Sequence, residues 1–179
     1  MSKILIISSS LRKNSNSEYL AKECAKGAKE AGNEVEFVSL KDKEIKYCIG
    51  CLACQKLGHC VIKDDVAEIM EKVKNVETLV FATPIYYYEM SGQLKTLLDR
   101  LNPLYPTDYK FRKVYMIATA AEDGDFVFEK AYSGLGGWVD CFEKAELCSI
   151  VSCGGINVPD EAKNHDDIKQ KVYSFGKSL

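Results

Sequence analysis

The segment SSSLRKNSNSEYL, residues 8–20, carries most of the polar chemistry near the start of the sequence and directly follows the apolar run KILIIS. Its hydroxyls and amides can donate hydrogen bonds, and the guanidinium of Arg12 can donate two N–H groups to a phosphate. A helix that begins here adds free backbone N–H groups and the positive end of its dipole. The segment therefore predicts a site for a terminal phosphate monoester, while capping of that helix by Asn16 or Ser17 is an equally good interpretation.

A second segment, PIYYYEMSG at residues 84–92, places three tyrosines and a thioether directly after another apolar run. Such a series of side chains suits a flat ring. For Tyr87 and Tyr88 individually, a place in the core or in a subunit interface fits the pattern at least as well. The segment predicts a planar ligand near this loop and leaves the roles of these two tyrosines open.

Four cysteines lie within the segment CIGCLACQKLGHC, hereafter the cysteine ladder, at Cys48, Cys51, Cys54 and Cys60. Thiolates this close can surround a cubane cluster, and the C-x2-C-x2-C-x5-C spacing is similar to the ferredoxin pattern, which has a shorter last gap and a proline where Val61 stands. Zinc fits less well, because its cysteine pairs usually lie a dozen or more residues apart. A redox-active C-x-x-C pair and four ordinary thiols are the remaining interpretations.

The elements that must position these segments follow from hydrophobic periodicity. Strands are expected at residues 3–8, 34–40, 77–83, 113–119 and 147–153, and helices at residues 19–31, 66–76, 91–101, 126–145 and 166–176. Because strands that are apolar throughout are typical of a parallel sheet covered on both faces, we predict a doubly wound α/β fold with strand order 2-1-3-4-5. Ligands of such folds bind beyond the carboxyl ends of the strands, where the serine-rich and tyrosine-rich loops lie.

Length, charge and composition limit the class of protein. The chain has 179 residues, so we expect a single domain over residues 1–179 with a sizeable core. Its 24 Lys plus Arg and 26 Asp plus Glu give a net charge of -2. This charge lacks the basic excess that is typical of nucleic-acid-binding domains, so we expect no nucleic-acid partner. No apolar run has the length of a membrane span and the N-terminus lacks the features of a signal peptide, so we expect a cytoplasmic protein with reduced thiols and no membrane partner.

Four motifs together resemble those of the flavodoxin-like NAD(P)H-dependent FMN reductases, and in particular their iron-sulfur flavoprotein branch. The motifs are SSLRKNSNS, CIGCLACQKLGHCVIKDD, ATPIYYYEMSGQLKTLLDR and TAAED. The resemblance covers nearly the whole chain and implies a flavodoxin-like fold, FMN as cofactor and NAD(P)H as electron donor. The first motif departs from the family, which more often has Gly and Pro where this chain has Ser9 and Leu11, and Gly permits backbone torsions that Ser resists.

The resemblance also implies roles for individual residues. By matching position, the FMN phosphate would contact Ser10, Arg12, Asn16 and Ser17, the isoalloxazine and ribityl chain would contact Pro84, Ile85, Tyr86 and Tyr87, and the other edge of the ring would contact Thr119, Ala120, Ala121 and Glu122. In the iron-sulfur branch a similar ladder holds a [4Fe-4S] cluster, which makes Cys48, Cys51, Cys54 and Cys60 the candidate ligands. Hydride transfer to a flavin demands no protein acid or base, and no catalytic residue is assigned.

The resemblance implies an NAD(P)H-dependent oxidoreductase that reduces a flavin, a quinone or a similar small-molecule electron acceptor, with the redox chemistry carried by the cofactor. The alternative is an iron-sulfur flavoprotein that relays electrons between FMN, a [4Fe-4S] cluster and a protein partner. A flavin-binding regulatory module without turnover is a third possibility. The resemblance further implies a homodimer or homotetramer.

Overall fold

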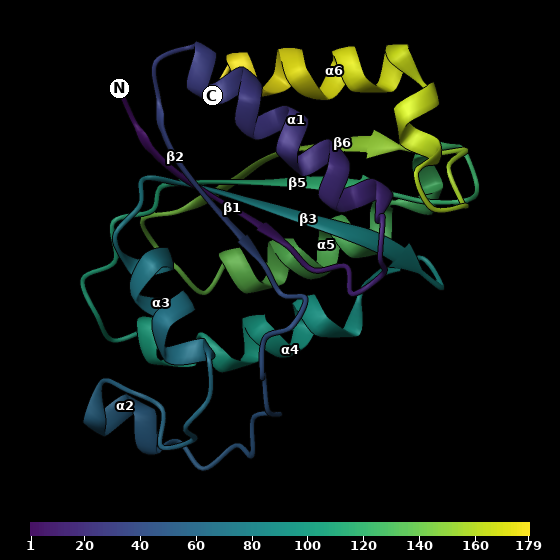
Figure 1. Cartoon of the computed structure of the whole chain (residues 1–179). Helices are drawn as coiled ribbons and strands as arrows, with labels where there is room; N and C mark the ends of the chain where they lie inside the picture. Colours follow the sequence, from purple (N-terminus) through teal and green to yellow (C-terminus); the bar gives the residue numbers. More distant parts are fainter.

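The computed structural model describes residues 1–179 and consists of one central sheet with helices on both faces (Figure 1). Its strands are β1 Lys3–Ser8, β2 Glu34–Ser39, β3 Thr78–Tyr86, β4 Glu89–Met90, β5 Lys113–Thr119 and β6 Glu146–Cys153. Its helices are α1 Asn16–Glu30, α2 Ala53–Leu57, α3 Val66–Lys74, α4 Gly92–Arg100, α5 Glu129–Val139 and α6 Asp166–Lys177, with short 3-10 turns η1 Asn102–Leu104, η2 Asp125–Val127 and η3 Glu161–Asn164. None of the helices is long and apolar enough to cross a membrane.

The five long strands are parallel and lie in the order β2-β1-β3-β5-β6. Counted among themselves they follow the predicted order 2-1-3-4-5, so the doubly wound prediction is confirmed. The prediction missed the two-residue strand β4, which pairs antiparallel with the end of β3. A strand this short has no periodicity from which it could be recognised.

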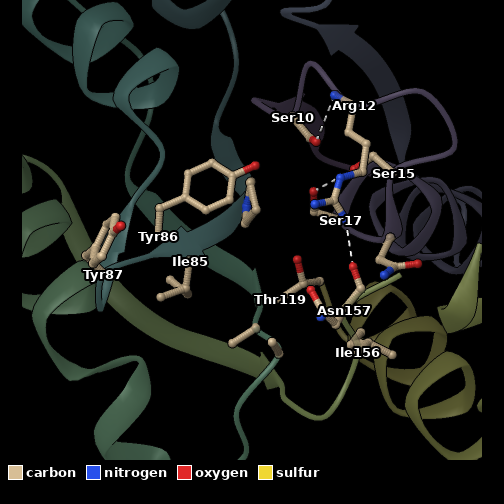
Figure 2. Close-up of a pocket in the computed structure, with 14 residues that line it drawn as sticks. Ser10, Arg12, Ser15, Ser17, Ile85, Tyr86, Tyr87, Thr119, Ile156 and Asn157 are labelled. Atoms are coloured by element: carbon tan, nitrogen blue, oxygen red, sulfur yellow. Dashed lines mark hydrogen bonds between the residues drawn. The ribbon is translucent and has the colours of Figure 1, made fainter. Parts of the chain in front are cut away.

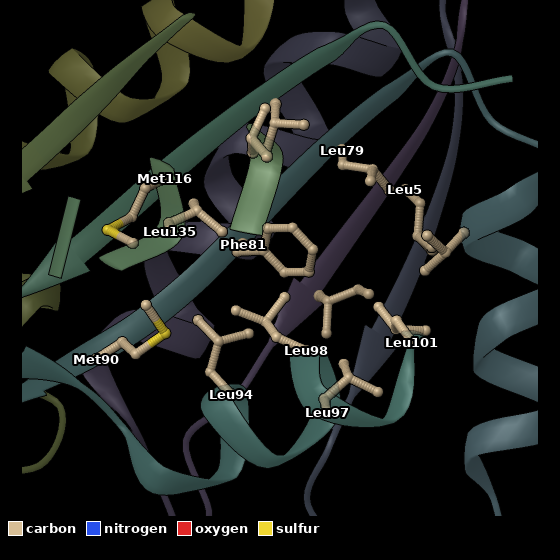
Figure 3. Packing of buried hydrophobic residues seen from close by; sticks show 14 of the residues in the cluster. Leu5, Leu79, Phe81, Met90, Leu94, Leu97, Leu98, Leu101, Met116 and Leu135 are labelled. Atoms are coloured by element: carbon tan, nitrogen blue, oxygen red, sulfur yellow. The ribbon is translucent and has the colours of Figure 1, made fainter. Parts of the chain in front are cut away.

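Residues alternate between the two faces of the sheet and so build two separate cores. Leu5, Leu79 and Phe81 face α3, α4 and α5, and Figure 3 shows Leu94 and Leu98 of α4 packed close to Phe81. The opposite face carries a second buried cluster with α1 and α6. Because both faces are covered, the carboxyl ends of the parallel strands are the open edge at which a ligand can bind.

Two helices, α1 and α5, differ from the predicted segments by three residues or more at one or both ends, and the other three predicted helices differ by one or two residues. Helix α1 begins at Asn16 and is capped by Ser15, whose Oγ accepts a hydrogen bond from the backbone N–H of Glu18 at 3.3 Å. Neither Asn16 nor Ser17 is therefore the cap. Helix α5 is shorter than the predicted segment 126–145, because η2 occupies its start and a turn after Asp140 leads into β6.

The turn between β3 and β4 is strained. Tyr87 and Tyr88 are its two central residues and both have positive φ, 51° and 67°. Two-residue hairpin turns of this kind favour Asn or Gly, because a bulky side chain disfavours the left-handed region. We expect Tyr87→Asn to raise the free energy of unfolding by about 0.5–1 kcal/mol in a urea titration, since the Tyr87 side chain is 98% exposed. A lower free energy of unfolding would mean that the contacts of the Tyr87 ring stabilise the fold by more than the positive φ of Tyr87 destabilises it.

Candidate functional site

A cleft of about 620 Å³ opens at the carboxyl edge of the sheet, as the close-up in Figure 2 shows. Its volume lies in the range of about 300–1,000 Å³ that is usual for small-ligand pockets. It is lined by the carboxyl ends of β3 and β5 and by segments that follow β1, β3, β5 and β6. Every residue that the sequence predicted to bind the cofactor lines this cleft except Glu122, and the cleft also contains Ser15, Ile156 and Asn157. The topology thus brings three distant predicted segments to one place.

One end of the cleft is rich in hydrogen-bond donors. The hydroxyls of Ser15 and Ser17 lie 3.0 Å apart, and Ser10 lines the same region. Because α1 begins here, the backbone N–H groups of Asn16 and Ser17 have no partner within the chain. The positive end of the α1 dipole adds to these donors, so this end of the cleft suits an anion.

Arg12 lies at the same end and is exposed, so most of its guanidinium is available to a ligand. Its Nη1 donates to the carbonyl oxygen of Asn157 at 2.6 Å, and Figure 2 shows this bond linking the loop after β1 to the loop after β6. The bond fixes the direction of the side chain and leaves other N–H groups free. An arginine oriented in this way is suited to bind a phosphate.

The Asn16 side chain, in contrast, is already engaged. Its Nδ2 donates to the carbonyl oxygen of Val158 at 2.9 Å, and its Oδ1 accepts from the backbone N–H of Ala162 at 3.1 Å. Asn16 therefore holds the loop after β6 in place, and its backbone N–H remains as the group that can contact a ligand. Asn16 lines the cleft, so the prediction that it contacts the phosphate now rests on this backbone group.

The other end of the cleft is a slot between an aromatic wall and a wall of small residues. Tyr86 and Tyr87 come from the β3–β4 hairpin, Thr119 is the last residue of β5, and Ala120 and Ala121 follow it. The short side chains of the two alanines leave room for a flat group opposite the tyrosines. The shape of this end fits a planar ring.

Glu122 is the one predicted residue that does not line the cleft. The chain bends at Ala121 and Glu122, and the Glu122 carboxylate accepts a hydrogen bond from the Tyr88 hydroxyl, with 3.1 Å between Oη and Oε2. This hydrogen bond and the charge of the carboxylate raise the pKa of Tyr88. Glu122 thus contacts the hairpin rather than the space where a ring would lie.

Ile156 and Asn157 belong to the loop after β6, which contains none of the predicted site residues. The general rule for doubly wound sheets applies to every carboxyl end, so it includes this loop. Its sequence, GGINVPD, has no cluster of hydroxyl or basic side chains from which a ligand site could be predicted. Asn157 contributes through its backbone carbonyl, which no residue-type pattern reveals.

The cysteine ladder lies apart from the cleft, in the region that contains α2 at the lower left of Figure 1. Cys48 and Cys51 are exposed, whereas Cys54 and Cys60 are half-buried. The Sγ of Cys54 accepts a hydrogen bond from Nδ2 of Asn102 at 3.1 Å. No three Cys, His, Asp or Glu side chains converge on a point that could hold a metal ion, so this conformation does not assemble the candidate cluster site.

Two cysteines outside the ladder are chemically protected. Burial raises the pKa of the Cys24 thiol to about 12 and that of the Cys153 thiol to about 12. Both side chains lie in the core between the sheet, α1 and α6. They act as small buried apolar groups.

Known proteins resemble this chain in sequence and in fold. Residues 2–134 match the family model of the NADPH-dependent FMN reductases. An iron-sulfur flavoprotein of Methanocaldococcus jannaschii is 43% identical over 102 residues, which cover 57% of this chain and 53% of that protein. A Bacillus subtilis protein named as an NAD(P)H-dependent FMN-containing oxidoreductase is 30% identical over 130 residues, 68% of each chain. The match thus spans about half the length of the iron-sulfur flavoprotein.

Among solved structures, the NAD(P)H:quinone oxidoreductase of Methanothermobacter marburgensis superimposes with a TM-score of 0.80. The superposition covers 99% of this chain and 96% of that chain at 18% sequence identity. At this identity the similarity establishes a common fold. The function must therefore be inferred from the residues of the cleft.

Proposed function

The chain belongs to the NADPH-dependent FMN reductase family, and on this basis we propose that it is an FMN-binding, NAD(P)H-dependent oxidoreductase. The observation that carries the proposal is the cleft, which joins an anion site at the start of α1 to a slot with an aromatic wall. When bound, FMN would accept a hydride from NAD(P)H and deliver electrons to a small acceptor such as a flavin or a quinone.

The residues of the cleft fit the two ends of FMN. Arg12, the hydroxyls of the serine-rich loop and the unpartnered N–H groups of Asn16 and Ser17 would hold the phosphate. Tyr86 of the hairpin and Ala120 after β5 both line the cleft and would contact the ring. The protein's part in the reaction is therefore to bind and orient the cofactor, and no side chain in the cleft is assigned as an acid or base.

Arg12→Ala is expected to weaken FMN binding by about 10- to 100-fold, because a hydrogen-bonded charge opposite the phosphate is lost. The dissociation constant follows from the quenching of FMN fluorescence on titration with protein. Lys13→Ala is the matched control, since it removes the same charge from an exposed neighbour that does not line the cleft. Equal affinities of the two variants would remove Arg12 from the phosphate site.

The function itself is tested by the visible absorption spectrum of anaerobically purified protein before and after NADPH is added. A two-banded flavin spectrum that bleaches rapidly, and recovers when a quinone or free flavin is supplied, is the expected result. Protein that retains no flavin and does not bind added FMN would contradict the proposal. Bound flavin that is reduced neither by NADH or NADPH nor by reduced ferredoxin would instead support a regulatory module without turnover.

The second candidate function is electron relay by an iron-sulfur flavoprotein. The spacing of the cysteine ladder favours it, and several relatives carry that name. Because the four sulfurs do not converge here, binding of a [4Fe-4S] cluster would require the ladder to change its conformation. A broad absorption beneath the flavin bands that is lost in air, together with flavin reduction by reduced ferredoxin but not by NADPH, would establish this function.

Family membership also favours assembly into a homodimer or homotetramer. The hairpin tip is an exposed aromatic surface of the kind that subunit interfaces cover, with Tyr86 47% and Tyr87 98% exposed. Light scattering of the purified protein gives the number of subunits directly.

A further inference from the structure

We propose that Tyr88 and Glu122 are positioning residues that hold together the two walls of the ring end of the cleft. The ring end is the part of the cleft lined by Tyr86 and Tyr87 on one side and by Thr119, Ala120 and Ala121 on the other. The inference rests on the proposed function, because the ring end has a role only if a planar cofactor binds there. Tyr88 follows the wall formed by Tyr86 and Tyr87, and Glu122 follows the wall formed by Thr119, Ala120 and Ala121. The hydrogen bond from the Tyr88 hydroxyl to Glu122 connects these two walls directly.

The wall that ends at Glu122 is fixed by the loop after β6. The backbone N–H of Ala120 donates to the carbonyl oxygen of Cys153 at 3.1 Å, and the N–H of Ile156 donates to the carbonyl oxygen of Ala120 at 3.0 Å. Gly154 packs so closely that a Cβ there would lie 2.8 Å from Cα of Asp123 and 2.9 Å from the carbonyl oxygen of Glu122. Glu122 is therefore an anchor point on a rigid part of the fold.

The opposite wall is less well restrained by itself. Only Ile85 with Met90 and Tyr86 with Glu89 pair in the hairpin, and beyond them the chain turns through two left-handed tyrosines. A side chain in the left-handed region persists where the surroundings fix it. Met90 at the base of the hairpin is buried in the core, but the tip extends beyond both paired residues, so a contact from Tyr88 to another segment would restrain the tip itself.

The Tyr88 side chain supplies that contact. Besides the bond to Glu122, its ring lies 6.3 Å from the Phe126 ring between centroids, and Nζ of Lys130 lies 5.5 Å from its centroid. All three partners come from the segment between β5 and the first turn of α5. Tyr88 therefore links the tip of the aromatic wall to the segment that continues the opposite wall, and so fixes the width of the slot before a ligand enters.

A slot of fixed width binds a flat ring without the cost of ordering a mobile wall. Loss of the Tyr88–Glu122 bond should therefore weaken FMN binding although neither side chain lines the cleft. We expect about 3- to 10-fold weaker binding for Tyr88→Phe and for Glu122→Ala, the range of one hydrogen bond at a partly exposed site. Because both variants remove the same bond, the double variant should bind FMN no more weakly than the weaker single variant.

Two further variants separate positioning from a general structural effect. Glu122→Gln should bind FMN within about twofold of the unmodified protein, because its amide oxygen can accept the same hydrogen bond. Tyr105→Phe removes a hydroxyl from another exposed tyrosine, one that lies outside the cleft, and should leave the dissociation constant unchanged. Affinity equal to that of the unmodified protein in Tyr88→Phe, or losses in Tyr88→Phe and Glu122→Ala that simply add, would overturn the inference.

Hydrogen exchange of the flavin-free chain tests the same inference without FMN. The peptide covering residues 84–91 should exchange faster in Tyr88→Phe than in the unmodified protein or in Tyr105→Phe. If the unmodified protein does not bind FMN, the proposed function fails, and this measurement still decides whether the bond holds the hairpin. Equal exchange in all three proteins would show that it does not.

Discussion

Asp64→Ala is expected to lower the free energy of unfolding by about 3–5 kcal/mol, because it leaves a buried arginine without its counter-charge. The side chains of Asp64 and Arg100 are 0% and 1% exposed. Their contact is bidentate, with Nη1 to Oδ2 at 2.6 Å and Nη2 to Oδ1 at 3.0 Å. Such a pair is not a large net source of stability, but removal of one partner is costly.

The same pair ties three segments of the chain together. Arg100 ends α4 and also donates from Nη1 to the carbonyl oxygen of Lys46 at 2.6 Å. Asp64 accepts from the backbone N–H of Lys46 at 2.9 Å and from that of Val66, the first residue of α3, at 3.2 Å. The two ends of the loop that contains the cysteine ladder are therefore fixed at one point, so loss of the pair should loosen the ladder as well as the core.

Urea unfolding of Asp64→Ala and of Asp99→Ala measures this effect against a matched control. Asp99 is the neighbour of Arg100 in sequence, but it forms a surface pair with Lys95 one turn earlier, a contact of about 0.3–0.5 kcal/mol. We expect the loss in Asp64→Ala to be several times that in Asp99→Ala. Similar losses would mean that the Arg100 guanidinium reaches water once Asp64 is gone.

The pair also predicts how stability depends on pH. Burial of the Asp64 carboxyl tends to raise its pKa, but the hydrogen bonds from Arg100 and from the backbone of Lys46 and Val66, with the charge of Arg100, together hold the pKa below its usual value. A lowered folded-state pKa stabilises the protein above the unfolded-state value of about 4, and this stability is lost as pH falls through the folded-state pKa. The unmodified protein should thus lose more stability below about pH 4 than Asp64→Ala does.

The fold could be predicted because its signals are local. Each long strand is a run of β-branched and apolar residues, and the helices between them impose parallel pairing, so order and layers follow from general rules. The cleft could be predicted for the same reason, since Arg12 lies in the loop after β1, and Tyr86 and Thr119 lie at the carboxyl ends of β3 and β5. Residue type then led to the prediction of a phosphate near Arg12 and of a ring near Tyr86.

The parts that could not be predicted depend on direction and on distant partners. Glu122 is adjacent to Ala121 in sequence, but the chain bends at these two residues, and the Glu122 side chain contacts Tyr88 of the hairpin. The sequence does not give the direction in which a side chain points after such a bend. Asp64 resembles an acidic residue at the start of a helix, and only the fold brings Arg100 to it from 36 residues away. The ladder spacing identifies a set of soft ligands, whereas the conformation of that loop is set by contacts such as the one from Asn102 to Cys54.

Gly176→Ala is expected to lower the free energy of unfolding by about 3 kcal/mol, because it forces two packed helices apart. A Cβ at Gly176 of α6 would lie 2.1 Å from the carbonyl oxygen of Cys24 in α1, and a Cβ at Gly27 of α1 would lie 2.2 Å from that of Tyr173 in α6. Figure 1 shows α6 lying along α1 on one face of the sheet. Since both obstructing atoms belong to the backbone, no rotamer change can make room for the methyl group.

Gly137→Ala is the matched control, because Gly137 lies within α5 with no atom within 4 Å of an added Cβ. It should raise stability by about 0.5–1 kcal/mol through helix propensity alone. In a thermal scan, the melting temperature of Gly176→Ala should be roughly 6–12 °C lower than that of the unmodified protein. An unchanged melting temperature would mean that α6 moves away from α1 at little cost. Since the N-terminus of α1 lines the donor-rich end of the cleft, FMN affinity measured on Gly176→Ala then tells whether α1 keeps its place when α6 moves.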